Sequence, residues 1–241
     1  MLNGYKLIAV CLTKIQDEVT YEFIDALYQT VKGSDYRLLL FNSFSDLYHQ
    51  NVYDEGAKSI YQLLNYDLVD AVIIKADTLN DQQVIRDLIA RAKERQIPVI
   101  LLNMKAEGCY SIVPSYENVL SQLIEHVIKV HHKRKLYFLS GSMGESNSML
   151  REKIFRETLR DCGIDPQTAK VAYGEYWYGP AERAVENWIQ SGDLPEAIIC
   201  ANDAMAVAAC RVLKRHQIRV PEDMIVTGFD GVPSYQFHRP A

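Results

Sequence analysis

Short apolar runs alternate with longer amphipathic stretches along the whole chain, and this alternation limits the possible folds more than any other feature. The runs lie at residues 7–12, 37–41, 71–74, 99–102, 111–113, 136–139, 171–173, 197–200 and 224–226. Continuous apolar runs are typical of parallel strands buried on both faces, and the stretches between them carry apolar residues at helical spacing. Asn80 or Asp81 is expected to cap one of these helices. The pattern predicts an α/β fold of doubly wound parallel sheets with right-handed crossovers.

The number of strands predicts two lobes rather than one sheet. Nine strands are too many for a single ordinary sheet of this kind, but they suit two sheets of four or five. The break is expected near Pro114 and Ser115, which gives an N-terminal lobe at 1–114 and a C-terminal lobe at 115–241. Because no Gly/Ser/Pro-rich linker separates the lobes, we expect a short hinge. Ligands of such folds bind beyond the carboxyl ends of the strands, so we also expect an interlobe cleft.

The composition is that of an ordinary globular protein, and it limits the possible partners. Of the 241 residues, 48% are hydrophobic and 24% are charged, and a formal net charge of −5 argues against a surface that coats DNA. The five cysteines include no Cys-x-x-Cys pair, as expected in a reducing compartment. The first apolar run is too short for a secretory leader or a membrane span. We therefore expect a cytoplasmic protein with no membrane partner.

Sequence motifs of catalysis and metal binding are missing. The Ser-Gly-Ser-Met-Gly loop at 140–144 matches neither Gly-x-Ser-x-Gly nor a phosphate-binding loop. The glycines form no dinucleotide-binding fingerprint, and the six histidines show no zinc-ligand spacing. The sequence predicts no enzyme, no cofactor and no metal site, and an enzyme on an α/β scaffold stays as the rival class.

Four segments that follow predicted strands carry residues suited to a small ligand. The loop at 173–179 holds four aromatic rings, which either cover the sheet edge or form a wall on which a sugar or nucleoside stacks. Arg151 alone would be a surface residue, but its planar fork suits vicinal hydroxyls or a carboxylate. Of Asn202 and Asp203, one is expected to cap a helix and the other to face the cleft. Asp230 follows the last strand through a glycine turn.

The stretch at 204–213 is predicted to be a helix that is apolar on nearly every side. Its sequence is Ala-Met-Ala-Val-Ala-Ala-Cys-Arg-Val-Leu. A helix of this kind is buried all round, either inside a core or at a subunit contact. The second possibility favours a homodimer with twofold symmetry.

The last third of the chain resembles the effector-binding domain of the lactose- and purine-repressor (LacI) family. The specific match runs through Ala-Ile-Ile-Cys-Ala-Asn-Asp-Ala-Met-Ala at 197–206 and Val-Pro-Glu-Asp-Met-Ile-Val-Thr-Gly-Phe-Asp at 220–230. Weaker collinear matches at 36–43, 69–74, 98–103 and 151–155 extend the resemblance to essentially the whole chain. It implies a type I periplasmic-binding-protein-like fold and a small-molecule effector of the carbohydrate, nucleoside or purine class.

Carried over position by position, the resemblance implies six ligand-binding residues. These are Asp17, Ser115, Arg151, Tyr176, Asn202 and Asp230. In the family, the arginine clamps the ligand, the aromatic packs on it, and the asparagine and the last aspartate line the cleft. Four positions depart from the family pattern: Asp17 stands where an asparagine is usual, Val19 where an aromatic is usual, Ser115 where an aspartate is usual, and Gly231 where a second acid is usual.

The resemblance also implies what surrounds such a domain in a longer protein. Repressors of the family begin with a helix-turn-helix segment and continue past the position of Ala241 with a strand that returns to the first lobe and with terminal helices. We therefore expect the sensor of a transcriptional regulator that signals by cleft closure and contacts DNA only through a segment absent from this chain. Two alternatives stay open: a receptor module of a signalling protein such as a diguanylate cyclase, and an exported solute-binding protein of a transporter.

Overall fold

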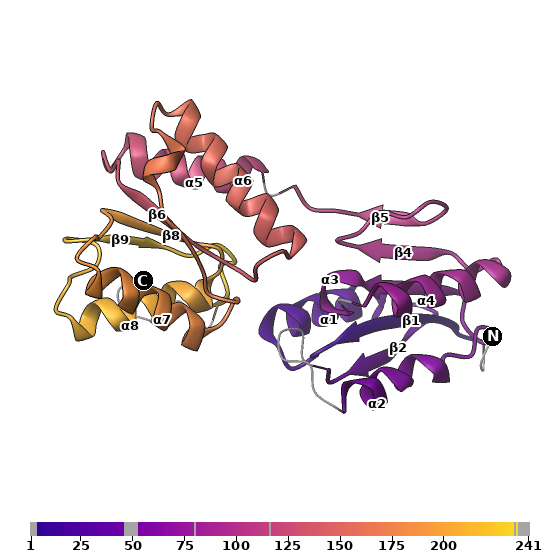
Figure 1. Cartoon of the computed structure of the whole chain (residues 1–241). Helices are drawn as coiled ribbons and strands as arrows, with labels where there is room; N and C mark the ends of the chain where they lie inside the picture. Colours follow the sequence, from indigo (N-terminus) through magenta and orange to yellow (C-terminus); the bar gives the residue numbers. More distant parts are fainter. Residues whose placement is uncertain (1–3, 46–52, 80, 116, 234, 236–241) are drawn as a thin grey trace. The chain divides into compact units, whose positions relative to one another are not determined.

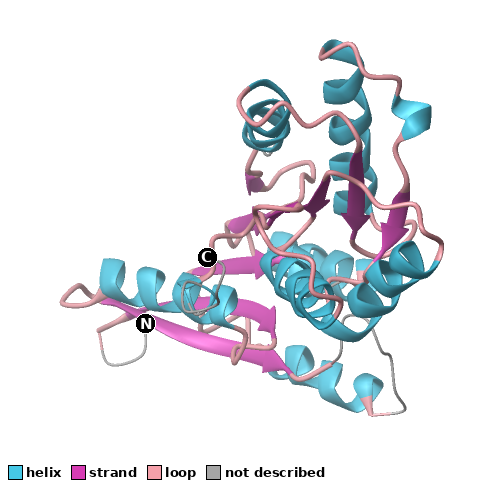
Figure 2. Cartoon of the chain, turned by 90° about the vertical axis from the view of Figure 1, so that its left-hand side faces the viewer, coloured by secondary structure: helices cyan, strands magenta, loops and turns pink. Residues whose placement is uncertain are grey.

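The computed structural model describes residues 4–45, 53–79, 81–115, 117–233 and 235 (Figure 1). The chain divides into two compact units, Met1–Pro114 and Ser115–Ala241, which we call unit 1 and unit 2. Each unit has a parallel sheet with helices packed against it (Figure 2). The predicted fold class of parallel-sheet α/β lobes is therefore confirmed.

Unit 1 contains a five-stranded sheet in the order β2-β1-β3-β4-β5, and all neighbouring strands are parallel. The strands are β1 (Lys6–Thr13), β2 (Tyr36–Ser43), β3 (Ala71–Lys75), β4 (Val99–Leu102) and β5 (Tyr110–Ile112). The helices are α1 (Glu18–Val31), α2 (Asp54–Lys58), α3 (Ala76–Leu79) and α4 (Gln82–Glu94), with a 3-10 helix η1 (Ser59–Leu63).

Alternate residues of β1 pack on opposite faces of the unit 1 sheet. Ala9 and Cys11 join the core that α4 and η1 cover, whereas Val10 and Leu12 join the core beneath α1. Because both faces are covered, the strand is apolar at nearly every position, as the sequence pattern predicted. The Asp81 side chain caps α4 by accepting from two backbone N–H groups, and Asn80, the alternative cap, lies outside the described residues.

Unit 2 contains a four-stranded parallel sheet in the order β7-β6-β8-β9. The strands are β6 (Leu136–Ser140), β7 (Val171–Tyr173), β8 (Ala197–Cys200) and β9 (Ile225–Thr227). The helices are α5 (Glu117–Lys129), α6 (Ser146–Asp161), α7 (Tyr178–Gln190) and α8 (Asp203–Arg215), with a 3-10 helix η2 (Pro166–Thr168). The order matches β2-β1-β3-β4 of unit 1, so the two sheets are wound alike.

The two faces of β6 show how the sheet of unit 2 is covered. The Phe138 ring stacks on Phe155 of α6 with centroids 5.0 Å apart. The neighbouring Tyr137 meets Trp188 of α7 edge to face at 5.2 Å. Figure 1 shows the same arrangement, with α5 and α6 on one side of the sheet and α7 and α8 on the other. Helices cover both faces of this sheet. The carboxyl ends of its parallel strands are therefore the part of the sheet that helices do not cover.

Helix α8 is mostly a core helix, and one of its sides lines a groove. Met205, Ala208 and Val212 are buried in the core of unit 2. Ala206 and Cys210, on another side of α8, line a groove of about 940 Å³ that continues over the segment after β9. Burial raises the pKa of the Cys210 thiol to about 11, so the thiol stays protonated at neutral pH.

Candidate functional site

Four of the six predicted ligand-binding residues gather in unit 2, each following a different strand. Arg151 lies on α6 after β6, Tyr176 follows β7, Asn202 follows β8, and Asp230 follows β9. The four strands are parallel neighbours, so their carboxyl ends form one edge of the sheet. This edge is where open α/β sheets bind ligands. We call these four residues the unit 2 site.

Arg151 is buried, with 8% of its surface exposed. Its Nη1 donates a hydrogen bond to the backbone carbonyl of Ala201, the residue after β8. The guanidinium carbon lies 4.4 Å from the centre of the Phe229 ring and 6.0 Å from that of Tyr176. At these distances the rings attract the cation and fix the plane of the guanidinium. The reading of Arg151 as an ordinary surface arginine is therefore wrong.

Tyr176 is fixed in place by its own hydroxyl and by a glycine beneath its ring. The hydroxyl hydrogen-bonds with Ser148 Oγ at 2.9 Å and donates to Glu145 Oε2 at 3.1 Å. A Cβ at Gly141 would lie 2.1 Å from the ring, so only a glycine permits this packing. Burial raises the pKa of the Tyr176 hydroxyl to about 12. The ring is a rigid part of the site rather than an adaptable one.

One of Asn202 and Asp203 was expected to cap a helix, and the structure confirms this for Asn202. Asn202 is the N-cap of α8, since its Oδ1 accepts from the backbone N–H of Met205, and its Nδ2 donates to the carbonyl of Tyr176 at 3.2 Å. Asp203 accepts from the backbone N–H groups of Phe229 at 2.8 Å and Val232 at 2.7 Å. Both side chains therefore tie together loops of the unit 2 site.

The Asp230 carboxylate accepts no hydrogen bond from another described residue. The residue is exposed, but nearby protein atoms desolvate the carboxylate and raise its pKa to about 6. This pKa is the net result: the charge of Arg151 lowers it, and the smaller effect of the Asp203 charge raises it. The result is an accessible acceptor close to a fixed cation.

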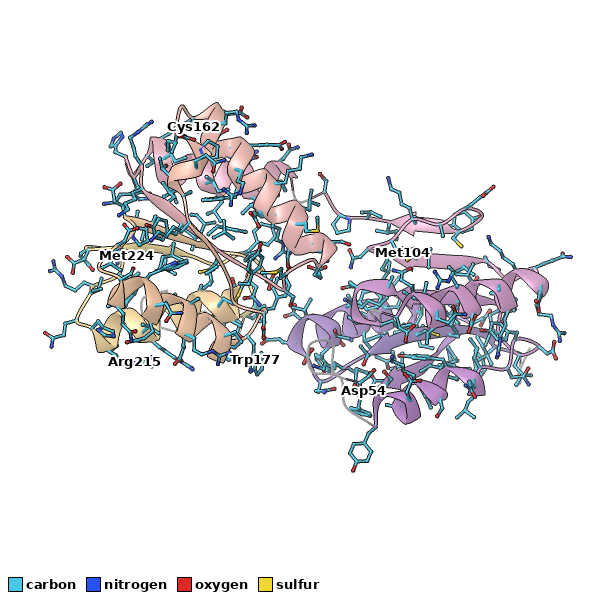
Figure 3. All side chains as sticks on the ribbon, viewed as in Figure 1. Asp54, Met104, Cys162, Trp177, Arg215 and Met224 are labelled. Carbon is cyan, nitrogen blue, oxygen red and sulfur yellow. The ribbon has the colours of Figure 1, made fainter. Side chains whose placement is uncertain are left out.

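The aromatic loop after β7 splits between the core and the solvent. Trp177, labelled in Figure 3, is 55% exposed, and its ring meets Tyr178 edge to face at 5.2 Å. Tyr178 donates a hydrogen bond to Tyr235 at 3.0 Å, and the Arg211 guanidinium lies 4.9 Å from its ring centre. Of the three consecutive rings in this loop, Trp177 is the one that offers an open apolar surface.

Glu145 is a residue of the site that sequence reasoning missed. Its carboxylate caps α6 by accepting from the N–H groups of Asn147 and Ser148, and it also accepts from the Tyr176 hydroxyl. Glutamate is not among the usual N-cap residues, so the capping rule gave no signal. The Ser-Gly-Ser-Met-Gly loop at 140–144 also matters here, because Gly141 makes room for the Tyr176 ring.

The remaining two predicted residues lie elsewhere in the chain. Asp17 occupies the N-cap position of α1 in unit 1 and is exposed. Ser115 is exposed and is the first residue of unit 2. Their roles as ligand contacts stay predictions.

The described ranges contain neither a candidate metal site nor a candidate membrane span. No group of three or more His, Cys, Asp or Glu side chains there is arranged to hold a metal ion. Likewise, no helix in the described part of the chain has the length and apolar character needed to cross a membrane.

Comparisons with known proteins agree with the geometry of the two units. The profile of the periplasmic binding protein-like domain matches residues 124–241. The transcriptional repressor PurR of Photobacterium profundum is 26% identical over 240 residues, which cover 99% of this chain and 68% of the relative. The repressor CytR of Escherichia coli is 23% identical over 241 residues, covering 99% of this chain and 67% of the relative. These relatives are transcriptional repressors rather than enzymes.

Solved structures show the same fold. A dimeric Lac repressor superimposes with a TM-score of 0.76 at 20% identity, covering 95% of this chain and 79% of that structure. A periplasmic solute-binding protein from Actinobacillus succinogenes with bound D-allose also gives a TM-score of 0.76, at 16% identity, and covers 95% of this chain and 80% of that one. At these identities the likeness concerns the fold alone.

Proposed function

We propose that this chain, a LacI-like effector-binding domain homologous to transcriptional repressors, binds a small hydroxyl-rich effector at the unit 2 site. The observation that carries the proposal is that Asp230 lies near Arg151, whose charge lowers the pKa of the Asp230 carboxyl. The carboxylate accepts no hydrogen bond from another described residue, whereas the guanidinium contacts Ala201 and Phe229. A receptor needs preorganised groups of this kind, because ordering them upon binding would lower the affinity.

The chemistry of the unit 2 site favours a sugar-like or nucleoside-like effector. An ionised carboxylate only accepts hydrogen bonds, so Asp230 selects hydroxyl or amino groups on the ligand. The exposed ring of Trp177 offers an apolar surface for the face of a sugar or a base. Two solved relatives support the sugar class, a Lac repressor bound to ONPG and the solute-binding protein with D-allose.

The output that fits this homology is control of transcription in the cytoplasm. The relatives are repressors of the helix-turn-helix type. We therefore propose that the protein contacts DNA through a segment other than residues 1–241. A homodimer is supported by the dimeric Lac repressor with the same fold. An effector regulates such a protein only if it binds one conformation more tightly than another. Asp17 and Ser115 stay proposed ligand contacts of this receptor.

A thermal-shift screen of monosaccharides, nucleosides and purines tests the proposal. A ligand present at a hundred times its Kd stabilises the folded chain by about 2.7 kcal/mol, which raises Tm by roughly 5–10 °C for a chain of this size. We expect Arg151→Ala to abolish this shift. Because Arg151 is buried and its loss also weakens the fold, Asp230→Asn serves as a second variant with little change in shape.

The control for the screen is Arg86→Ala, which removes an exposed arginine from α4 of unit 1. This variant should keep the full ligand-induced shift. A panel in which no compound stabilises the wild-type chain contradicts the sugar or nucleoside assignment. Equal shifts in the wild type and in both site variants contradict the location of the site.

A further inference from the structure

The carboxylate of Asp203 closes the loop that carries Asp230. Its Oδ1 accepts the backbone N–H of Phe229 at 2.8 Å, and its Oδ2 accepts the backbone N–H of Val232 at 2.7 Å. These two N–H groups stand on either side of Asp230 in the sequence. Both bonds are charge-assisted, which makes them stronger than bonds between neutral groups.

Gly228 permits this closure because it leaves room for the carboxylate. A Cβ on Gly228 would lie 2.2 Å from Asp203 Oδ1 and 3.3 Å from its Cα. The loop backbone at Gly228 and the start of α8 therefore lie so close that no side chain fits at residue 228. The contact depends on a glycine at one position and an acid of aspartate length at the other.

Helix α8 gives Asp203 a rigid base. Asp203 is its first residue, and the buried Ala204 and Met205 follow directly. A carboxylate in the first turn is also stabilised by the helix dipole. The position of Asp203 is therefore set by the core of unit 2 and not by the loop that it binds.

The loop held in this way carries two parts of the unit 2 site. Phe229 presents its ring to the guanidinium of Arg151, and the carboxylate of Asp230 lies near the charges of Arg151 and Asp203. We propose that Asp203 is the positioning residue of this site, which does not meet the effector but fixes Phe229 and Asp230 against Arg151. The role of the loop in binding rests on the proposed function. The two hydrogen bonds from Phe229 and Val232 to Asp203, which we call the clamp, can be tested without any ligand.

The test uses NMR of the full chain to measure amide hydrogen exchange in the loop and the pKa of Asp230. It compares the wild type with two variants that keep the charge of Asp203. Asp203→Glu lengthens the acid by one methylene, and Gly228→Ala drives a methyl group against the carboxylate. In both variants the Phe229 and Val232 amides should exchange at least about tenfold faster with solvent, because a bond to a charged acceptor is lost. The Asp230 pKa should fall from about 6 toward its ordinary value of about 4 as the loop opens to water.

The matched control is Asp161→Glu, the same substitution at the exposed end of α6. It should change neither the amide exchange nor the Asp230 pKa, and amides of β6 and β8 report whether each variant is folded. Unchanged exchange at Phe229 and Val232 in both variants overturns the clamp. Faster exchange with an unchanged Asp230 pKa overturns the positioning role. Neither measurement needs an effector, so a failed ligand screen and a failed clamp are distinguishable.

Discussion

At the residue scale, the affinity for an effector should depend on the protonation of Asp230. Desolvation raises the pKa of this carboxyl to about 6, so the ionised acceptor form dominates at neutral pH and is lost as the pH falls through that value. If the effector donates hydrogen bonds to the ionised form, the association constant falls by up to about tenfold per pH unit below the pKa. Isothermal titration calorimetry between about pH 5 and about pH 8 measures this change.

The matching control is Asp230→Asn, whose amide does not titrate. Its affinity should be weaker and should stay constant over the same pH range. A wild-type affinity that does not vary with pH, or a variant that follows the wild-type curve, contradicts the role of the carboxylate as an acceptor.

The sequence located the residues of the unit 2 site but not the contacts that fix them. The segments could be selected because residues after neighbouring parallel strands must share one edge of a sheet, whereas Tyr176 was chosen within its loop from the family resemblance. The burial of Arg151 and the clamp by Asp203 could not be predicted, because both arise from loops that meet only after folding. Whether these residues touch an effector stays a prediction.

At the element scale, the β6–α6 loop holds the Tyr176 ring through Gly141. An alanine there would place its Cβ 2.1 Å from the ring and 2.5 Å from Ser148 Oγ. We expect Gly141→Ala to lower the free energy of unfolding by about 1–3 kcal/mol, because the ring must move out of a packed position. Urea denaturation measures the change.

Gly179→Ala is the control for that substitution. Gly179 lies in α7, where the nearest atom to an added Cβ is Arg183 Nη1 at 3.6 Å, an ordinary contact. Alanine is the better helix former, so this variant should be as stable as the wild type or more so. Equal losses in the two variants would mean that the ring of Tyr176 is not what Gly141 accommodates.

The sequence predicted the elements well and their ends less well. The apolar runs predicted the strands because the central strands β1, β3, β6 and β8 are buried on both faces. The expected strands at 111–113 and 224–226 are shifted by one residue from β5 and β9. The shift arises because the hydrogen bonds that end a strand depend on its neighbouring strands. Helix α8 was expected to be buried in a core or at a subunit contact. Most of it lies in the core of unit 2, whereas Ala206 and Cys210 line a groove, and whether that side meets a second copy stays a prediction.

At the scale of the whole molecule, each unit has its own core. Leu101 of β4 belongs to a core of unit 1, and Leu139 of β6 belongs to the core of unit 2, with both side chains fully buried. We expect Leu101→Ala and Leu139→Ala each to destabilise their own unit by about 2–5 kcal/mol. The first should speed hydrogen exchange in residues 1–114 and the second in residues 115–241, as mass spectrometry of protein fragments can resolve.

The two leucine variants serve as controls for each other, because they make the same substitution at equally buried positions. Exchange that rises by the same amount in both units in either variant contradicts the independence of the cores. It would also contradict the proposed boundary at Pro114 and Ser115.

The claim that the strand ends of unit 2 bind a small molecule is tested most directly by an NMR titration. The isotope-labelled chain is titrated with the compound that raises Tm most in the screen. The proposed function predicts that the largest chemical-shift changes fall on Arg151, Tyr176, Asn202 and Asp230, and that the compound is recovered unchanged. Shifts confined to other parts of the chain, or conversion of the compound into a product, would contradict a receptor at this site.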